Sequence, residues 1–259
     1  MRQLIILTAL TLMACASTKN TAMANNEPET TAVQQNKTSV RRVSNFTKIT
    51  LIGSNDVIYT QGNRTSVKVV GKASDVDNIL TTVTQGTLVI KTSAQGGKFG
   101  FKFGSLSDDV KVYVTSPDIT QIRLQGSGDF KTSKKIDSDN LMVTMVGSGD
   151  IDLKNVICDK FTLDMRGSGD VEVDKLCCAT ANLSIRGSGD IDINEEKVTT
   201  TNAEIYGSGD MDLHLSQCGT VNCKVFGSGD ISLSGTLRHL NKSCKGSGDI
   251  HTRGLSFIK

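Results

Sequence analysis

Residues 147–166 read Gly-Ser-Gly-Asp-Ile-Asp-Leu-Lys-Asn-Val-Ile-Cys-Asp-Lys-Phe-Thr-Leu-Asp-Met-Arg, and the tetrapeptide that opens this stretch occurs seven times in the chain. A fixed period of 19 to 21 residues separates the copies. Such a period indicates a stacked repeat architecture, in which each unit buries its apolar face against its neighbours. The copies begin at Gly126, Gly147, Gly167, Gly187, Gly207, Gly227 and Gly246.

Apolar and polar residues alternate within the unit, first at Ile151 and Leu153 and again at Phe161, Leu163 and Met165. A period of two is typical of strands with one buried face. About twenty residues hold two or three short strands and their turns, with no room for a covering helix. Equivalent strands must then lie in register about 4.8 Å apart, so the sequence predicts an all-β parallel β-helix.

Each Gly-Ser-Gly-Asp is predicted to form the corner between two strands. Glycine reaches positive φ without steric cost, and the aspartate that follows can accept hydrogen bonds from turn amides. Gly53-Ser54-Asn55-Asp56 resembles an eighth, degenerate copy, which indicates that the solenoid begins well before residue 126. The predicted structural turn residues are Gly126, Gly128, Asp129, Gly147, Gly149, Asp150, Gly167, Gly169, Asp170, Gly187, Gly189, Asp190, Gly207, Gly209, Asp210, Gly227, Gly229, Asp230, Gly246, Gly248 and Asp249.

Composition is compatible with one elongated domain over residues 41–259. The chain has 259 residues, 37% of them hydrophobic, and only two prolines. Residues 41–120 are expected to form irregular N-terminal strands that cap the solenoid, and 121–259 to form the repeats. The net charge of +2 is spread over interspersed charges without a basic block, which argues against nucleic-acid binding.

The N-terminus has the features of a targeting segment. Arg2 precedes an apolar run over residues 4–15 that is too short to span a bilayer. Leu-Met-Ala-Cys at 12–15 matches a bacterial lipoprotein signal, so residues 1–15 are predicted to be a signal peptide with Cys15 as the lipidated residue. An ordinary secretory peptide cut after Ala24 is the alternative. Residues 16–40 are predicted to be a flexible tether, and membrane attachment would be through the lipid anchor alone.

Six further cysteines lie in the repeats, and most of them are expected to be small buried hydrophobes. A disulfide between the stacked Cys158 and Cys178 is the alternative, because adjacent strands lie within bridging distance and an exported protein can oxidise. No CxxC or Cys/His ligand spacing is present, so no metal site and no cofactor are predicted.

A glycine-rich segment over residues 96–104 carries Phe99, Phe101 and Phe103 beside two lysines. Exposed aromatic rings on a flexible loop would form a contact surface. The alternative is that the rings fold back into the core.

Two other functions are alternatives to a binding role. Stacked carboxylates, including a row through Asp152, Glu172, Asp192 and Asp212, resemble calcium-binding β-rolls, but that class repeats every nine residues, and turn amides can satisfy a single aspartate. A polysaccharide-active enzyme needs an unrepeated carboxylate cluster, whereas these carboxylates recur in every unit. No catalytic residue is therefore predicted, and calcium binding and polysaccharide cleavage stay as alternatives.

Several segments together resemble a known family: residues 43–49, 53–62, 83–90 and 112–117, followed by the Gly-Ser-Gly-Asp turns. They are similar to the auto-transporter adhesin head domain, or GIN domain, of exported proteins from Bacteroidetes-type bacteria, over roughly residues 41–255. The resemblance implies a right-handed, pectin-lyase-like β-helix and a role in cell adhesion, without catalytic residues. The expected protein is a non-catalytic cell-envelope module that binds a glycan or a protein, with its oligomeric state left open.

Overall fold

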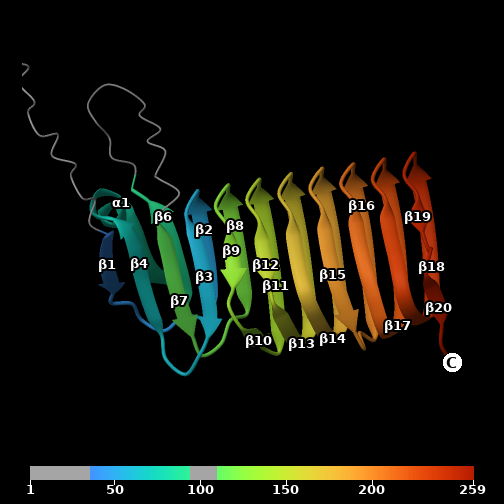
Figure 1. The fold of residues 1–259 in the computed structure, drawn as a ribbon, viewed down its shortest axis with the longest axis horizontal. Helices are drawn as coiled ribbons and strands as arrows, with labels where there is room; N and C mark the ends of the chain where they lie inside the picture. The colour runs from blue at the N-terminus through green and yellow to red at the C-terminus, as the bar shows by residue number, and fades with distance from the viewer. Residues whose placement is uncertain (1–35, 94–109) are drawn as a thin grey trace, which may run out of the picture. The chain divides into compact units, whose positions relative to one another are not determined.

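The computed structural model describes residues 36–93 and 110–259, which form a parallel β-solenoid of about seven turns preceded by antiparallel strands (Figure 1). The predicted parallel β-helix is confirmed. Cys15, most of the predicted tether and the loop with Phe99, Phe101 and Phe103 lie outside the described residues.

Each turn of the solenoid contains a long strand that leads into Gly-Ser-Gly, a short strand that follows it and a third short segment. The long strand β11 (Asn140–Gly147) pairs in parallel with β8 (Gln121–Gly126) and with the second half of β13 (Asn155–Gly167). The short strand β12 (Ile151–Leu153) lies beside β9 (Phe130–Thr132). Because the pairing is parallel and in register, residues about twenty apart in the sequence form straight columns.

The remaining strands continue this order. They are β10 (Lys135–Asp137), β14 (Val171–Gly187), β15 (Ile191–Glu196), β16 (Thr200–Gly207), β17 (Met211–Gly227), β18 (Ile231–Gly246), β19 (Ile250–His251) and β20 (Leu255–Phe257). In some later turns the segments join into one continuous strand, as in β14, β17 and β18.

The core consists of columns of inward side chains that touch their equivalents in the turns above and below. One column contains Met145, Met165, Ile185, Ile205 and Val225, all of them buried. Since each strand alternates buried and exposed positions, every second residue is left on the outer surface. The alternation along each strand therefore determines both which residues lie in the core and which lie in the outer rows.

The two glycines of a turn have different roles. Gly187 has a φ of +149°, and a Cβ there would lie 2.1 Å from the Gly167 carbonyl oxygen. Gly189 is not in the positive-φ region, but its Cβ would lie 2.0 Å from the Gly169 carbonyl oxygen. The first glycine is required for its positive φ. Both glycines are required because the backbones of successive turns pack directly on each other and leave no room for a Cβ.

The N-terminal region is built differently. The edge strand β1 (Asn36–Arg41) pairs antiparallel with β4 (Ser66–Lys72), which pairs antiparallel with β7 (Lys111–Ser116). A second antiparallel pair joins β5 (Ile79–Thr84) to β6 (Thr87–Thr92). The remaining elements are β2 (Lys48–Gly53), β3 (Asp56–Gln61) and the short helix α1 (Ala73–Asn78).

The structure revises the predicted start of the first strand and shows how far the stack of repeats extends toward the N-terminus. Strand β1 begins at Asn36, inside the predicted tether. The sequence does not reveal this strand because its residues are at most half-buried and show no apolar alternation. Gly53 at the end of β2 aligns with Gly126 at the end of β8, so the degenerate eighth copy belongs to the stack, which continues beyond it through parallel pairing of β2 with β6 and of β3 with β7. Among the described residues, the one helix is six residues long, and none is long and apolar enough to cross a membrane.

Candidate binding surface

The outward side chains of the long strands form a continuous surface, which we name the long-strand face. It extends over eight parallel strands: β2, β8, β11, β13, β14, β16, β17 and β18. Its outward residues fall into three rows. The middle row contains Arg123, Thr144, Asp164, Ser184, Glu204, Lys224 and Ser243. The row beside the turns contains Gln125, Val146, Arg166, Arg186, Tyr206, Phe226 and Lys245.

The third row, farthest from the turns, contains a ladder of carboxamides. The Asn202 side-chain amide donates to Asn182 Oδ1 at 2.9 Å, Asn222 donates to Asn202 Oδ1 at 2.9 Å, and Asn241 donates to Asn222 Oδ1 at 2.8 Å. Each inner amide uses one N–H and one oxygen lone pair in the ladder. The second N–H and the second lone pair of each are left for a ligand, and the ladder fixes their direction.

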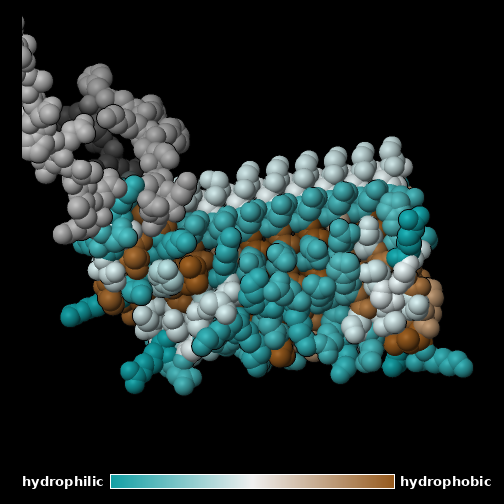
Figure 2. Space-filling view, in the orientation of Figure 1, coloured by the Kyte–Doolittle hydropathy of each residue, from teal (hydrophilic) through white to brown (hydrophobic). Residues whose placement is uncertain are grey.

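A shallow trough follows this row. It consists of two adjoining hollows of about 520 and 260 Å³ that share Thr162. The larger hollow lies over β13, β14, β16 and β17, and the smaller one over β2, β8, β11 and β13. Hydrophilic residues (teal) cover much of the visible surface of the solenoid in Figure 2, and hydrophobic residues (brown) show between them and at both ends.

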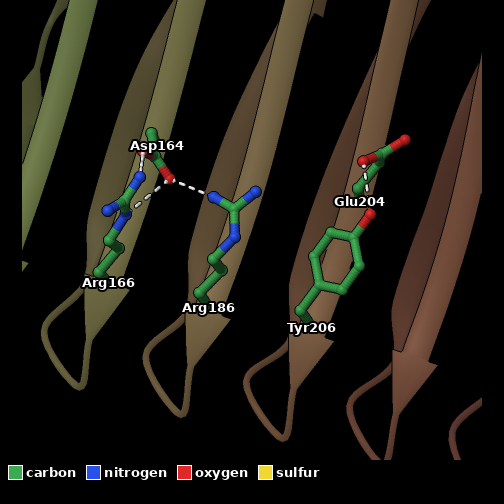
Figure 3. A network of polar contacts seen from close by, with 5 residues as sticks. All are labelled: Asp164, Arg166, Arg186, Glu204 and Tyr206. Atoms are coloured by element: carbon green, nitrogen blue, oxygen red, sulfur yellow. Dashed lines mark hydrogen bonds and ion pairs between the residues drawn. The ribbon is translucent and has the colours of Figure 1, made fainter.

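Charged side chains form a network along one side of the trough (Figure 3). The Asp164 carboxylate accepts from Arg166 on its own strand and from Arg186 on the next strand, both at 2.7 Å. Lys224 lies 2.9 Å from Glu204 and holds the pKa of that carboxyl below its ordinary value. Two guanidinium groups thus share one carboxylate, and Arg186 uses only its Nη1 in this contact.

Aromatic rings and cations stack on one another in the row beside the turns. The Tyr206 and Phe226 rings are parallel within 6°, with centroids 4.9 Å apart. Arg186 lies over the Tyr206 ring at 5.3 Å and Lys245 over the Phe226 ring at 5.9 Å. Because neighbours cover the ring faces, the row presents ring edges and cationic groups rather than a flat stacking platform.

The turn aspartates form a different ladder at the edge of the solenoid. In each case the backbone N–H of one aspartate donates to Oδ1 of the equivalent aspartate one turn earlier, for example from Asp210 to Asp190 at 2.8 Å. The same bond links all the turns from Asp56 to Asp249, at 2.7 to 3.3 Å. The turn carboxylates therefore have backbone partners that compensate their negative charge.

Acidic side chains gather on the surface formed by the short strands. The ligand atoms of Asp152, Glu172 and Asp174 lie within 4.8 Å of one another. The Lys154 ammonium lies 2.9 Å from Asp152 and 3.1 Å from Asp174, and it offsets part of the negative charge of the cluster. Burial, followed by the two neighbouring carboxylates, raises the pKa of Glu172. A cation bound here would have to displace Lys154.

The six described cysteines are free. Cys158, Cys178, Cys218 and Cys223 are buried, as expected for small hydrophobes in the stack, whereas Cys244 is exposed. Cys158 and Cys178 are direct neighbours in register, and the hydrogen bond between the two thiols, together with burial, raises the pKa of Cys178.

One ionisable side chain lies in the core. Glu195 is 1% exposed and occupies a column whose neighbours are Leu176 and Leu215. Thr201 donates to its Oε2 at 2.6 Å and the Cys218 thiol lies 3.9 Å from the same atom, while Oε1 has no hydrogen-bond partner. Burial raises the pKa of Glu195 to about 7.

The sequence predictions concentrated on the turn residues, and the long-strand face was not among the predicted sites. The turn glycines and aspartates lie together along one edge, beside the row of Arg166 and Arg186, and are not among the residues that line the trough. The signal for the trough was present as asparagines at intervals of 20 and 19 residues (Asn182, Asn202, Asn222, Asn241). It was missed because outward columns vary in residue type, whereas the turns repeat without change.

Comparisons with known proteins agree with this architecture. The sequence model of the family described as "putative auto-transporter adhesin, head GIN domain" matches residues 45–218 and 180–258. A crystal structure described as a putative adhesin from Bacteroides fragilis has a TM-score of 0.71 and 25% identity, and covers 84% of this chain and 97% of its own. No curated protein sequence matches the chain.

Two further crystal structures, both from Parabacteroides distasonis, share the fold. One is described as a putative lipid binding protein (TM-score 0.63, 22% identity, 86% of this chain and 97% of its own). The other is described as a putative adhesin (TM-score 0.67, 19% identity, 85% and 97%). The family model covers most of the described solenoid, and the chain therefore belongs to the adhesin head GIN-domain family.

Proposed function

We propose that this protein is an exported, non-catalytic module of the cell envelope that binds a glycan or a protein through its long-strand face. The observation that carries the proposal is the trough, in which half-buried, hydrogen-bonded amides and charged groups from successive strands line one face of the solenoid. Membership of an adhesin family supports a binding role. Lipidation of Cys15 would attach the solenoid to the membrane, with the following residues as a tether.

The carboxylates favour binding over catalysis. A hydrolase of the two-carboxylate type needs an acid and a base facing one bond in a local cluster. In the trough, Asp164 and Glu204 lie on the first and third of three neighbouring strands, and both are engaged by basic side chains. This arrangement suits recognition of a polar ligand.

Location and anchoring are tested by protease treatment of intact cells that produce the protein with a C-terminal tag. We expect loss of the tagged domain while a periplasmic control protein stays intact. In a Cys15→Ala variant we expect the protein to leave the membrane fraction. Full protection of the tag would contradict a position on the cell surface, which adhesion requires, and an unchanged membrane fraction for the variant would contradict the lipid anchor.

Binding through the long-strand face is tested by adhesion of the purified domain to cells and extracted envelope material. A double variant, Arg166→Gln with Arg186→Gln, alters the face without touching the core. We expect it to lose most of the adhesion. Equal adhesion by the wild type and this variant would contradict the proposed surface.

A further inference from the structure

Building on the proposed function, we infer that the ligand of the long-strand face is a linear, carboxylate-bearing polysaccharide that lies in the trough parallel to the solenoid axis.

The direction follows from the repetition of the surface. Parallel strands lie about 4.8 Å apart, so eight strands present equivalent positions over about 34 Å. Asn182, Asn202 and Asn222 place the same amide at the same height in consecutive strands. A polymer with hydroxyl groups at regular intervals can use each of these groups in turn, whereas a compact molecule could contact only a few.

The charge of the ligand follows from the charged residues that line the trough. Five basic side chains, Lys48, Lys160, Arg166, Arg186 and Lys224, line it against two acidic ones, Asp164 and Glu204. This excess is larger than the net charge of +2 of the whole chain. Within the described part of the chain, neither Lys48 nor Lys160 has a carboxylate within ion-pair distance.

The two arginines indicate which kind of anion fits. A guanidinium group matches a carboxylate with two parallel N–H donors, and stacking on a ring restricts its rotation. Arg186 is held by Asp164 on one side and by the Tyr206 ring on the other, and only its Nη1 is used in the ion pair. A ligand carboxylate can therefore bind Arg186 without breaking the network.

A protein partner fits this surface less well. Protein interfaces rely on apolar and aromatic side chains buried at their centre. Exposed apolar groups on the face are scattered, as at Met142 and Val146, and the faces of the Tyr206 and Phe226 rings are covered. Sugar hydroxyls, in contrast, can pair with the free N–H and oxygen positions of the asparagine ladder.

The test is titration calorimetry of the purified domain with oligogalacturonate and oligomannuronate of about eight sugars. The matched control ligand is the methyl-esterified oligogalacturonate, which keeps the backbone and loses the charge. We expect binding of at least one uronate, at least tenfold weaker binding of the ester, and affinity that falls with salt. Failure of both uronates to bind, or equal binding of the ester, would overturn the inference.

Two pairs of substitutions locate the site. Arg166→Gln with Arg186→Gln removes two positive charges from the trough, and Lys131→Gln with Lys175→Gln removes two from the strands outside it. We expect the first pair to weaken uronate binding at least tenfold and the second pair to leave it within twofold. Equal losses for both pairs would overturn the assignment. Melting curves for both variants check that they are folded.

A further ligand separates this inference from the proposed function. Polyglutamate of matched charge tests an acidic protein partner, and binding as tight as that of the uronate would overturn the polysaccharide assignment. If no uronate binds but the Arg166→Gln, Arg186→Gln variant still loses adhesion to cells, the proposed ligand class is wrong, and the proposal that the long-strand face binds the ligand is retained. If the variant adheres like the wild type, the proposed function itself fails.

Discussion

The N-terminal region and the Gly-Ser-Gly-Asp repeats build one solenoid by different rules. In the repeats, each strand lies beside its equivalent in the next turn, and the two glycines of each turn have no space for a side chain. In the N-terminal region, antiparallel pairs such as β1 with β4 and β5 with β6 cover the end of the stack. The comparison teaches that the repeats keep their turns and core constant, which leaves the outward rows free to carry binding chemistry.

The two ends of the solenoid differ in the same way. The N-terminal end is covered by antiparallel strands and α1. At the C-terminal end, residues 238–246 of β18 pair only with β17 among the described residues. There Lys242, which is exposed, stands in register with the inward residues Leu183, Ala203 and Cys223 of earlier turns. An inward charge on an edge strand opposes pairing with another chain.

The largest expected effect concerns the turn glycines. Gly187→Ala should destabilise the domain by more than about 3 kcal/mol, because the new methyl group would meet a backbone carbonyl and the backbone has positive φ. The matched control is Gly86→Ala in the N-terminal β5–β6 hairpin, where φ is +71° but nothing lies within 4 Å. It should cost about 1 kcal/mol. Urea denaturation measures both, and similar losses would contradict the difference between the regions.

A second prediction concerns the pH dependence of the repeats. The pKa of Glu195 is raised from 4.5 to about 7 in the folded state. The protonated form is therefore favoured by folding, and its contribution is complete below about pH 4.5 and lost as the pH rises through 7. We expect stability to fall by roughly 3 kcal/mol between pH 5 and pH 9.

Two substitutions isolate this effect. Glu195→Leu, which matches Leu176 and Leu215 in the same column, should remove that fall and raise stability at pH 8. The Glu195 charge contributes to raising the pKa of the Cys178, Cys218 and Cys223 thiols, and these cysteines are present in both the wild type and the variant. Glu196→Gln, at the half-buried neighbour that pairs with Lys175, should leave the pH profile nearly unchanged. A wild-type profile that is flat between pH 5 and pH 9 would contradict the assignment.

The smallest expected effect is on association at the open end. Lys242→Val should restore the apolar inward column at the edge and increase self-association, as measured by analytical ultracentrifugation. Lys245→Val removes a charge from the outward side of the same strand and serves as the control. Equal association of the two variants, or none beyond the wild type, would show that Lys242 does not protect the edge.

The sequence predicts the repeats well because their spacing, turn residues and alternation all indicate the same structure. The start of the domain was placed too late, since β1 has no buried residue and pairs with β4 about thirty residues away. The helix α1 was not predicted, because its six residues show no helical period of apolar residues. The trough depends on outward residues in register, which are visible only after the strands have been aligned.

The most direct test of the account is a crystal structure of the domain with an oligogalacturonate or oligomannuronate. We expect a sugar chain parallel to the solenoid axis over the asparagine ladder, with a carboxylate on Arg186. A sugar bound across the strands, or on the acidic surface around Asp152 and Glu172, would contradict it.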